Sequence, residues 1–434
     1  MIPSVHRLVS AAAALAVALA ASPARAQLPV APDTGLTVSL LTMGSGDAVW
    51  EKFGHNAIWI HDPAAGTDYV YNYGVFDFRS PGYWNRFIKG TWRYELGVAD
   101  MATTMYQYQY LNRSVWSQRL NLTPAQEREV QRFLSWNARP ENKEYLYDYY
   151  RDNCSTRLRD IIDRVTGGAL RRTADGVTRS TSYRWHSERL VGDDWPTYAG
   201  LAVGLGPAAD TPIRPWGEMF LPFKLRQWVR EVRLSGAGST AVPLVAEERT
   251  LFQAVGRGPE PRMPPPAMPI FLAIGWTLAW ALILIGRRAH TSRAARFGFS
   301  ALSAVWLLFT STGGLVLLGL WAFTDHQIAY RNENVLQLSP LALPLVLLVP
   351  CLAYGARWAA RPARLLAFAV AGMSVLGLLC QVLPFLFPQR NGHVIALALP
   401  MNLAVAAGVW WLSRRMETPA EAAASVRAPA LGAS

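Results

Sequence analysis

The sequence predicts an exported α+β domain followed by an all-α domain of five transmembrane helices. Three observations indicate this fold class. The chain begins with the pattern of a secretory signal peptide, its apolar excess is concentrated after about residue 268, and the stretch between has ordinary globular composition. That stretch is long enough for one hydrophobic core of roughly 240 residues.

Residues 1–26 form the predicted signal peptide. A positive charge at Arg7 is followed by an apolar run from Leu8 to Ala21 and by small residues up to Ala26. A basic start, a short apolar centre and small residues ahead of a cleavage site are typical of secretory signals, whereas a membrane anchor needs a longer apolar run. We therefore expect cleavage after Ala26 and a domain that folds outside the cytoplasm.

Two neighbouring runs early in this domain resemble strands. Phe53 to Ile60 (FGHNAIWI) and Tyr69 to Phe78 (YVYNYGVFDF) are rich in aromatic and β-branched residues. Asp62-Pro63 lies between them and favours a turn. The pattern predicts an antiparallel hairpin.

Further strands and helices follow in the chain. Tyr94 to Gly97 and Trp116 to Leu122 resemble short strands, and Thr123-Pro124 opens a helix that extends to about Asn137. A second helix, described next, comes after it, and the sequence is then poorly periodic to about residue 250. Strands followed by helices in this order favour an α+β fold.

The segment from Asp148 to Asp163 (DYYRDNCSTRLRDIID) predicts a helix with a cysteine in its first turn. Apolar residues recur there at helical spacing, and Gly167-Gly168 can end the helix. Asp152 or Asn153 can cap its start, which puts Cys154 among unpaired backbone N–H groups at the positive end of the helix dipole. We therefore expect the pKa of the Cys154 thiol to be lowered.

Cysteine usage makes this thiol a candidate nucleophile. Of the 3 cysteines, Cys351 and Cys380 fall in predicted membrane helices, so Cys154 has no disulfide partner in the exported domain. An unpaired thiol in an oxidising compartment calls for a functional explanation. The alternative is a buried thiol that acts as a small apolar residue, and the polar neighbours of Cys154 argue against it.

A catalytic thiol needs a base, and the exported domain offers His55, His61 and His186. His55 belongs to the FGHNAIWI strand and can face a helix N-terminus, where it would take the thiol proton and later return one. His61 and His186 are interpreted as ordinary surface or hydrogen-bonded histidines. Asn72 or Asp77 on the next strand can orient the imidazole, depending on register, and Asn72 is the candidate for the third catalytic residue.

Residues 256–267 form a predicted linker between two separate units. Its core, GRGPEPRMPPP, is too polar for lipid and too rich in proline for a helix. Five apolar runs follow, each long enough or nearly so to cross a bilayer core of about 30 Å. They are 268–286, 297–323, 340–356, 365–387 and 393–412, within a transmembrane domain that we place at 268–415.

Arginines indicate the orientation of these runs. They cluster after the first, third and fifth runs, at Arg287, Arg288, Arg293, Arg296, Arg357, Arg361, Arg364, Arg414 and Arg415. By the positive-inside rule those sides are cytoplasmic, which places the preceding domain outside, as the signal peptide requires. The C-terminus is then cytoplasmic, and residues 416–434 are expected to be a disordered tail.

The formal net charge of +12 comes partly from these arginines. No basic stripe with base-stacking aromatic residues occurs, so we expect no nucleic-acid partner, and basic residues of the exported domain suit an anionic membrane surface. Neither CxxC, HExxH, a P-loop nor GxGxxG is present. We therefore expect no metal and no cofactor.

Five sequence blocks together resemble one family. In order along the chain they are GHNAIWI, VYNYGVFDF, YDYYRDNCSTRLRD, GLG at 204–206 and MFLP at 219–222. With them the chain resembles the Lnb-type bacterial lipoprotein N-acyltransferases over nearly its whole length, and DNCSTRLRD is the most specific block. The resemblance implies a circularly permuted papain-like domain of the NlpC type at residues 27–255, in which the histidine strand precedes the cysteine helix.

The resemblance also implies an activity. Cys154 and His55 take the positions of the family's catalytic pair. The protein would be a cysteine-dependent enzyme of the bacterial inner membrane with its catalytic domain in the periplasm. It would move an acyl chain from a phospholipid donor, through a Cys thioester, to the N-terminal amino group of a diacylglyceryl-modified lipoprotein.

Four further residues are candidates for substrate binding. Tyr73 is one of them, next to Asn72 in the strand. The others, His326, Asn332 and Asn334, lie in a polar loop between the second and third apolar runs, on the same side of the membrane as Cys154. The alternative for this loop is a solvated connector.

Other function classes remain open at this point. A cell-wall peptidase or amidase of the NlpC type, or a thiol phospholipase, would use the same Cys/His pair, although a soluble wall substrate does not require five membrane helices. A membrane sensor without enzymatic activity is a third class, and in it Cys154 would be dispensable.

Overall fold

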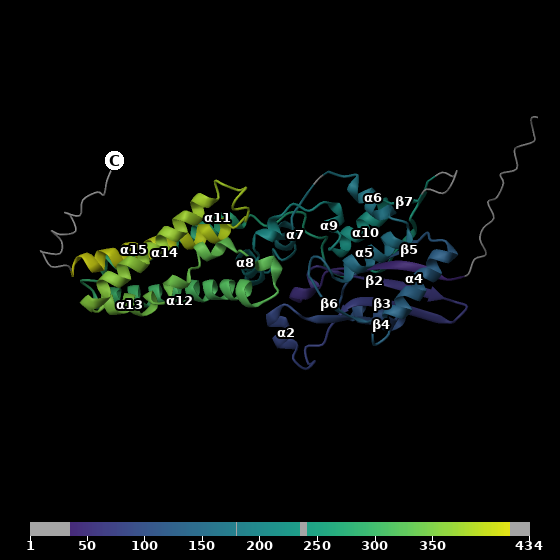
Figure 1. The fold of residues 1–434 in the computed structure, drawn as a ribbon, viewed down its shortest axis with the longest axis horizontal. Coiled ribbons are helices and arrows are strands. Elements are labelled where there is room, and N and C mark those ends of the chain that lie inside the picture. Colours follow the sequence, from purple (N-terminus) through teal and green to yellow (C-terminus); the bar gives the residue numbers. More distant parts are fainter. Residues whose placement is uncertain (1–34, 179, 235–240, 417–434) are drawn as a thin grey trace, which may run out of the picture.

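The computed structural model describes residues 35–178, 180–234 and 241–416. The predicted signal peptide lies outside these residues, and so does the predicted tail beyond residue 416. Figure 1 shows two parts arranged end to end, a sheet with covering helices and a bundle of long helices. We call residues 35–255 the sheet domain and residues 267–416 the helical bundle. The predicted fold class, a mixed α/β domain followed by apolar helices, is confirmed.

The sheet is antiparallel throughout, with the strand order β6-β4-β3-β2-β1-β5-β9. Its strands are β1 (Thr37–Met43), β2 (His55–Asp62), β3 (Thr67–Val75), β4 (Arg93–Asp100), β5 (Val115–Leu120), β6 (Glu144–Leu146) and β9 (Val245–Phe252). A separate two-stranded ribbon contains β7 (Arg233–Leu234) and β8 (Val242–Pro243).

The predicted hairpin is β2 and β3, which pair with Ile58 opposite Tyr71. β3 ends at Val75, so the last residues of the predicted YVYNYGVFDF strand leave the sheet. Gly74 adopts a φ of +95°, in the left-handed region, and the pairing with β4 shifts register between Tyr73 and Val75. This irregularity turns the chain away from the sheet edge.

Helices cover both faces of the sheet. One face packs on α4 (Pro124–Asn137), α5 (Cys154–Val165), α6 (Ala169–Asp175) and α10 (Pro222–Glu231), and the other packs on α3 (Met101–Tyr110). The central strand β1 is buried on both sides, because Leu40 joins the first core and Leu41 joins the second. Thr123 caps α4, as its sequence predicts.

Shorter elements connect these parts and lie toward the bundle. They are η1 (Val49–Glu51), α2 (Tyr83–Lys89), α7 (Tyr183–Leu190), α8 (Trp195–Gly204), η2 (Pro207–Asp210) and α9 (Pro215–Glu218). Three of the helices, α7, α8 and α9, fall in the stretch that has no clear period in the sequence.

The bundle contains five helices that match the predicted runs in order. They are α11 (Ala267–Arg288), α12 (Arg293–Phe323), α13 (Leu345–Ala353), α14 (Ala360–Cys380) and α15 (Gly392–Arg414), with the short turns η3 (Gln327–Ala329), η4 (Glu333–Leu336), η5 (Pro340–Ala342) and η6 (Arg357–Ala359). In the described chain, 4 helices are long and apolar enough to cross a membrane. A fifth candidate is a pair of segments, Glu333–Ala342 and Leu345–Ala353, bent by 52°.

Two predicted runs differ from the structure. The run at 340–356 is not one helix, because Pro340 and Pro344 interrupt the backbone hydrogen bonding before α13. The run expected to continue to 387 ends earlier, since α14 stops at Cys380 and the irregular segment after it contains Pro384 and Pro388.

The bent pair nevertheless joins opposite ends of the bundle. Its start lies at the sheet domain, where Asn332 donates to the Gly204 carbonyl at 3.1 Å. Its end lies at the far side, where the Arg296 guanidinium, near the start of α12, is 5.9 Å from the ring centroid of Tyr354. The described chain therefore passes along the bundle five times, and α15 ends away from the sheet domain (Figure 1).

Polar side chains inside the bundle form hydrogen bonds with the bent pair and with the helices beside it. Gln337 donates to the Ser374 carbonyl at 2.9 Å, and Asn402 donates to the Gln337 carbonyl at 3.0 Å. The Trp306 indole N–H donates to Asn402 at 2.9 Å. Irregular backbone at membrane depth requires such internal partners because lipid offers none.

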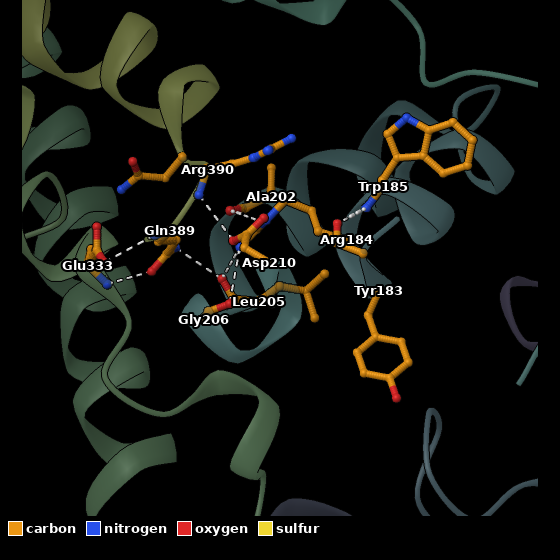
Figure 2. A network of polar contacts seen from close by, with 12 residues as sticks. Tyr183, Arg184, Trp185, Ala202, Leu205, Gly206, Asp210, Glu333, Gln389 and Arg390 are labelled. Atoms are coloured by element: carbon orange, nitrogen blue, oxygen red, sulfur yellow. Dashed lines mark hydrogen bonds and ion pairs between the residues drawn. The ribbon is translucent and has the colours of Figure 1, made fainter. Parts of the chain in front are cut away.

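The sheet domain and the bundle meet through a buried polar network (Figure 2). Arg184 of α7 pairs with Asp210 of η2, with Nε 2.9 Å from each carboxylate oxygen, and both side chains are almost fully buried. Asp210 also accepts the backbone N–H of Arg390 at 3.1 Å. Gln389 donates to the Leu205 carbonyl at 3.0 Å. Since a buried charge requires its partner, this junction favours one relative position of the two parts.

The predicted linker is held against the sheet domain. Residues 256–266 contain no helix or strand, as their proline content predicts. However, Arg257 pairs with Asp47 at 2.8 Å, and Arg189 donates to Glu260 at 3.1 Å and to the Pro261 carbonyl at 2.7 Å. The segment is therefore not the free spacer that its composition suggests.

Candidate active site

Cys154 is the first residue of α5, and the residue that caps the helix is Asn153 rather than Asp152. The Asn153 side-chain oxygen accepts the backbone N–H groups of Ser155 and Thr156, each at 2.9 Å. This cap satisfies two of the N–H groups that a helix start leaves unpaired. The thiol is partly buried at the positive end of the helix.

The start of α5 is anchored from two directions. Asn153 donates through its amide nitrogen to the Phe220 carbonyl at 2.9 Å, and the Ser155 hydroxyl lies 2.8 Å from the Met219 carbonyl. Met219 and Phe220 are the first residues of the MFLP block, so this block holds the cysteine helix. The Ser155 hydroxyl also lies 3.0 Å from the side-chain oxygen of Asn56, on β2.

This last contact brings the two candidate catalytic residues together. Asn56 follows His55, the first residue of β2, and its side chain is fixed by the Leu41 carbonyl at 3.1 Å and the Thr42 hydroxyl at 2.9 Å. The backbone N–H of Asn56 faces the Cys154 sulfur. The thiol therefore lies beside the peptide bond that joins His55 to Asn56.

Asn72 reaches the imidazole from the neighbouring strand. Its side chain hydrogen-bonds the ring of His55, and its amide nitrogen lies 3.3 Å from the Val70 carbonyl. Asp77, the alternative orienting residue, is exposed beyond the end of β3 and accepts the backbone N–H of Arg79 at 2.9 Å. Asn72 and not Asp77 thus reaches His55, and Cys154 lies beside the peptide bond that follows His55.

Burial keeps the imidazole of His55 neutral. Desolvation lowers the pKa of His55 from 6.5 to about 4, and the Arg113 cation lowers it further, while the hydrogen bond from Asn72 acts in the opposite direction. The ring is therefore uncharged at neutral pH and can accept a proton.

The thiol departs from the prediction. Burial raises the pKa of Cys154 above its ordinary value, although the backbone N–H groups of Asn56, Ser155 and Cys154 itself lower it. The expectation of a lowered pKa is wrong because desolvation of the thiolate outweighs the N–H groups of the helix start. At rest the Cys154 thiol and the His55 imidazole are therefore both uncharged.

Two features near the pair have no clear signal in the sequence. Arg113 is buried, donates to the Gly44 carbonyl at 2.9 Å and pairs with Glu51 at 3.0 Å, and its charge favours the thiolate. The Tyr145 hydroxyl of β6 is buried and has no hydrogen-bond partner among the described residues. An isolated arginine or tyrosine in the sequence gives no indication of such a position.

Gly74 keeps the space between the tyrosine and the cysteine open. A Cβ at this position would lie 3.8 Å from the Cβ of Cys154 and 3.9 Å from the hydroxyl oxygen of Tyr145. No side chain of residue 74 therefore separates the two groups. Burial raises the pKa of Tyr145 well above its usual range, so its hydroxyl stays protonated and can donate.

The four candidate substrate-binding residues have structural partners instead. Tyr73 is buried in the core and its hydroxyl donates to Asn137, so it is not available to a substrate. Asn332 donates to the Val203 carbonyl at 2.9 Å, and Asn334 to the Ala202 carbonyl at 3.1 Å, both in the junction. These contacts are structural, because buried polar groups require hydrogen-bond partners.

His326 also joins the two parts of the molecule. Its Nε2 lies 3.1 Å from the Phe87 carbonyl of α2, and its ring centroid lies 5.4 Å from that of Trp92. The loop that carries it is therefore held against the sheet domain at α2 and Trp92. Of the other two histidines, His61 pairs with Asp68 at the surface and His186 is buried against Thr181, in keeping with their ordinary interpretation.

The pKa shifts predict how the thiol reacts with iodoacetamide. Because the thiolate reacts and the pKa of Cys154 is raised, the alkylation rate should keep rising beyond about pH 9 and should show no plateau near neutral pH. The measurement is the alkylated fraction of the Cys154 peptide, by mass spectrometry, in the full chain with Cys351→Ser and Cys380→Ser. The His55→Ala variant should show the same profile, because no imidazolium stabilises the thiolate. A plateau below about pH 8 that His55→Ala removes would show an ion pair instead.

Among the described residues, no group of three or more His, Cys, Asp or Glu side chains is placed to hold a metal ion. Residues 30–188 match the family model of the Lnb N-terminal periplasmic domain. This match covers β1 through most of α7 and includes His55, Asn72, Tyr145 and Cys154. No curated protein and no solved structure matches the chain.

Proposed function

Because residues 30–188 match the family model of the Lnb N-terminal periplasmic domain, we propose that the protein is a membrane-bound, cysteine-dependent N-acyltransferase of bacterial lipoproteins. The observation that carries the proposal is the cluster of Cys154, His55 and Asn72 in a domain fixed to apolar membrane helices. A thiol nucleophile, a neutral base and an amide that orients the base suffice for acyl transfer.

In the first step the Cys154 sulfur attacks the carbonyl carbon of a phospholipid acyl ester. His55 takes the thiol proton as the carbon–sulfur bond forms, which avoids a free thiolate at a buried site where its pKa is raised. The tetrahedral intermediate then expels the glycerol oxygen, which receives the proton from His55. The products are a lysophospholipid and an acyl thioester on Cys154.

In the second step the free amino group of a diacylglyceryl-modified lipoprotein attacks the thioester. His55 accepts a proton from the amine and returns it to the Cys154 sulfur as the amide forms. A pKa of about 4 keeps His55 in the neutral, proton-accepting form throughout the neutral range. The burial of the site limits the access of water, which would otherwise hydrolyse the thioester.

The developing oxyanion requires hydrogen-bond donors. The backbone N–H of Cys154 at the helix start is the first, and we assign the Tyr145 hydroxyl as the second because it is protonated and has no described partner. Gly74 leaves room for a substrate carbonyl between them.

Tyr145→Phe tests this assignment. Turnover should fall about 100-fold through loss of one oxyanion donor. Stability should not fall, because the deleted hydroxyl forms no described hydrogen bond. The control is Tyr73→Phe, whose hydroxyl binds Asn137 in the core, and which should cost about 0.5–1.5 kcal/mol of stability with little effect on turnover. Normal turnover in Tyr145→Phe would remove it from the mechanism.

Several features support the finer parts of the proposal. A histidine strand before a cysteine helix suits a circularly permuted papain-like domain, which we propose for residues 27–255. If this domain lies in the periplasm, the five passes of the bundle put the end of α15 in the cytoplasm. Both substrates are then in the outer leaflet of the inner membrane, beside the junction.

The proposal is tested by reconstituting the full chain in nanodiscs with an isotope-labelled phospholipid and a purified diacylated lipoprotein. The expected product is a lipoprotein peptide that carries a labelled acyl amide at its N-terminal cysteine, formed together with lysophospholipid. Labelled free fatty acid without the amide would indicate a thiol phospholipase. Cleavage of muropeptides without either product would indicate a cell-wall hydrolase.

A further inference from the structure

Four apolar side chains form an exposed ridge on the sheet domain. They are Trp50, Phe78, Trp84 and Ile88, with exposed fractions of 59%, 42%, 60% and 64%. The ring centroids of Trp50 and Phe78 are 5.6 Å apart, and those of Phe78 and Trp84 are 6.1 Å apart. A contiguous exposed group of large apolar side chains is costly in water and marks a contact surface.

The apolar ridge begins beside the candidate active site. Trp50 lies in η1, just ahead of His55 on β2. On the other side, a Cβ at Gly74 would lie 3.8 Å from the Cβ of Cys154, and the exposed Val75 follows Gly74 in the chain that leads to Phe78. The two segments that form the start of the ridge are therefore the segments that flank the catalytic pair.

Helix α2 forms the other end of the ridge. Trp84 and Ile88 are one helical turn apart and share its outer face. The opposite face is anchored, since Tyr83 is buried and the ring centroid of Phe87 lies 4.7 Å from that of Trp92. The anchored face holds the exposed face outward.

The structure also gives the height of α2 relative to the membrane. The backbone N–H of Asp325, just after the end of α12, donates to the Lys89 carbonyl at 2.8 Å. Helix α12 has 31 residues. At about 1.5 Å per residue it is about 46 Å long, close to the thickness of a bilayer with its headgroups, about 40–45 Å. If α12 spans the bilayer, its end lies at the level of the headgroups, and α2 lies there with it. Figure 1 shows α2 at the bundle side of the sheet domain.

We infer that the apolar ridge inserts into the headgroup region of the bilayer leaflet at the sheet-domain end of the bundle. Tryptophan is favoured at this depth, where its ring is partly apolar and its N–H stays hydrated. Arg86 and Lys89 in the last turn of α2 add positive charge that suits phosphate groups. The partner of this surface is thus a lipid bilayer.

The ridge also has a role in delivering the acyl donor to the thiol, and this role rests on the proposed function. An acyl ester lies at the boundary between headgroups and acyl chains, which is the depth that the ridge reaches. The apolar side chains of Trp84, Phe78 and Trp50 lead from that depth toward the segments that flank Cys154. The ridge would therefore present membrane lipid, and not soluble esters, to the thiol.

The membrane contact is tested without any enzymatic readout. A nitroxide label is placed at Ile88→Cys in a full chain that also carries Cys154→Ala, Cys351→Ala and Cys380→Ala, reconstituted in phospholipid bilayers. Relaxation by oxygen should be strong and relaxation by a water-soluble nickel chelate weak. The matched control is Val242→Cys, which is 45% exposed on β8. This strand pairs with β7, which lies on the side of the sheet domain away from the bundle (Figure 1). If both labels relax equally with nickel, the inference is overturned.

The role in lipid delivery is tested by the double variant Trp84→Ser/Ile88→Ser, whose changed side chains are exposed. Transfer from bilayer phospholipid should fall about tenfold or more, because a poorly positioned substrate loses rate steeply. Acylation of Cys154 by a soluble short-chain ester should stay unchanged. Equal loss with both donors, or no loss with either, would overturn the delivery role. Failure of the parent protein to acylate any lipoprotein would reject the proposed function and leave the nitroxide result standing.

Discussion

Replacement of Cys154 by alanine is expected to reduce N-acylation to the uncatalysed rate, because no other described group near His55 can form the thioester. Cys154→Ser should retain a small residual rate, since a hydroxyl in the same place is a weaker nucleophile. His55→Ala should lower turnover by about 10²- to 10⁴-fold, the usual contribution of a general acid–base residue. Each variant is measured in the nanodisc assay by mass spectrometry of the lipoprotein N-terminal peptide.

His61→Ala is the matched control for His55→Ala, because His61 lies on the same strand, is exposed and pairs with Asp68. It should leave turnover unchanged. The same variants should be compared in cells depleted of their usual lipoprotein N-acyltransferase, where wild type restores growth and Cys154→Ala does not. Full complementation by Cys154→Ala, at normal membrane levels, would rule out catalysis by this thiol.

Asn153→Ala is expected to impair both stability and turnover. Its side chain caps α5 through two backbone N–H groups and donates to the buried carbonyls of Tyr149 and Phe220, at 2.9 Å each. Loss of the cap and of these donors should cost about 2–4 kcal/mol in free energy of unfolding. Turnover should fall by about 100-fold or more, because the first turn of α5 sets the position of the nucleophile.

Two comparisons separate the roles of this side chain. Asn153→Asp keeps the acceptor but loses both donations and places a charge in a buried site, so it should also be impaired. Thr123→Ala removes the cap of α4, away from the catalytic cluster, and should cost about 0.5–2 kcal/mol without loss of turnover. An Asn153→Ala variant as stable and active as wild type would contradict the anchoring of α5 described above.

The elements that the sequence predicts well depend on neighbouring residues. The capped start of α5, the Thr123 cap of α4 and the β2–β3 hairpin each have a signal within a few residues. The same holds for the apolar helices, whose composition alone separates them from the sheet domain. The combination of a histidine strand and a lone exported cysteine was enough to name Cys154 and His55 as candidates.

Elements that have no local signal in the sequence were not predicted. The central strand β1 is buried on both faces, so its sequence, TVSLLTM, lacks the alternation of a half-exposed strand. Helices α7 and α8 depend on the Arg184–Asp210 pair and the junction with the bundle rather than on their own period, and α9 is held through Glu218, which accepts from Thr181. The bend before α13 is tolerated because Asn402 of α15 donates to the backbone carbonyl of Gln337 in the bent pair.

Short-range patterns in the chain were sufficient to predict that a cysteine opens a helix, that a histidine strand precedes it and that apolar helices follow. The contact of Asn72 rather than Asp77 with His55, the role of Asn332 and Asn334 in the junction, and the raised pKa of Cys154 became apparent only in the folded molecule. The physical reason is that strand register, desolvation and the pairing of buried polar groups depend on residues far apart in the chain, which become neighbours only when the chain is folded.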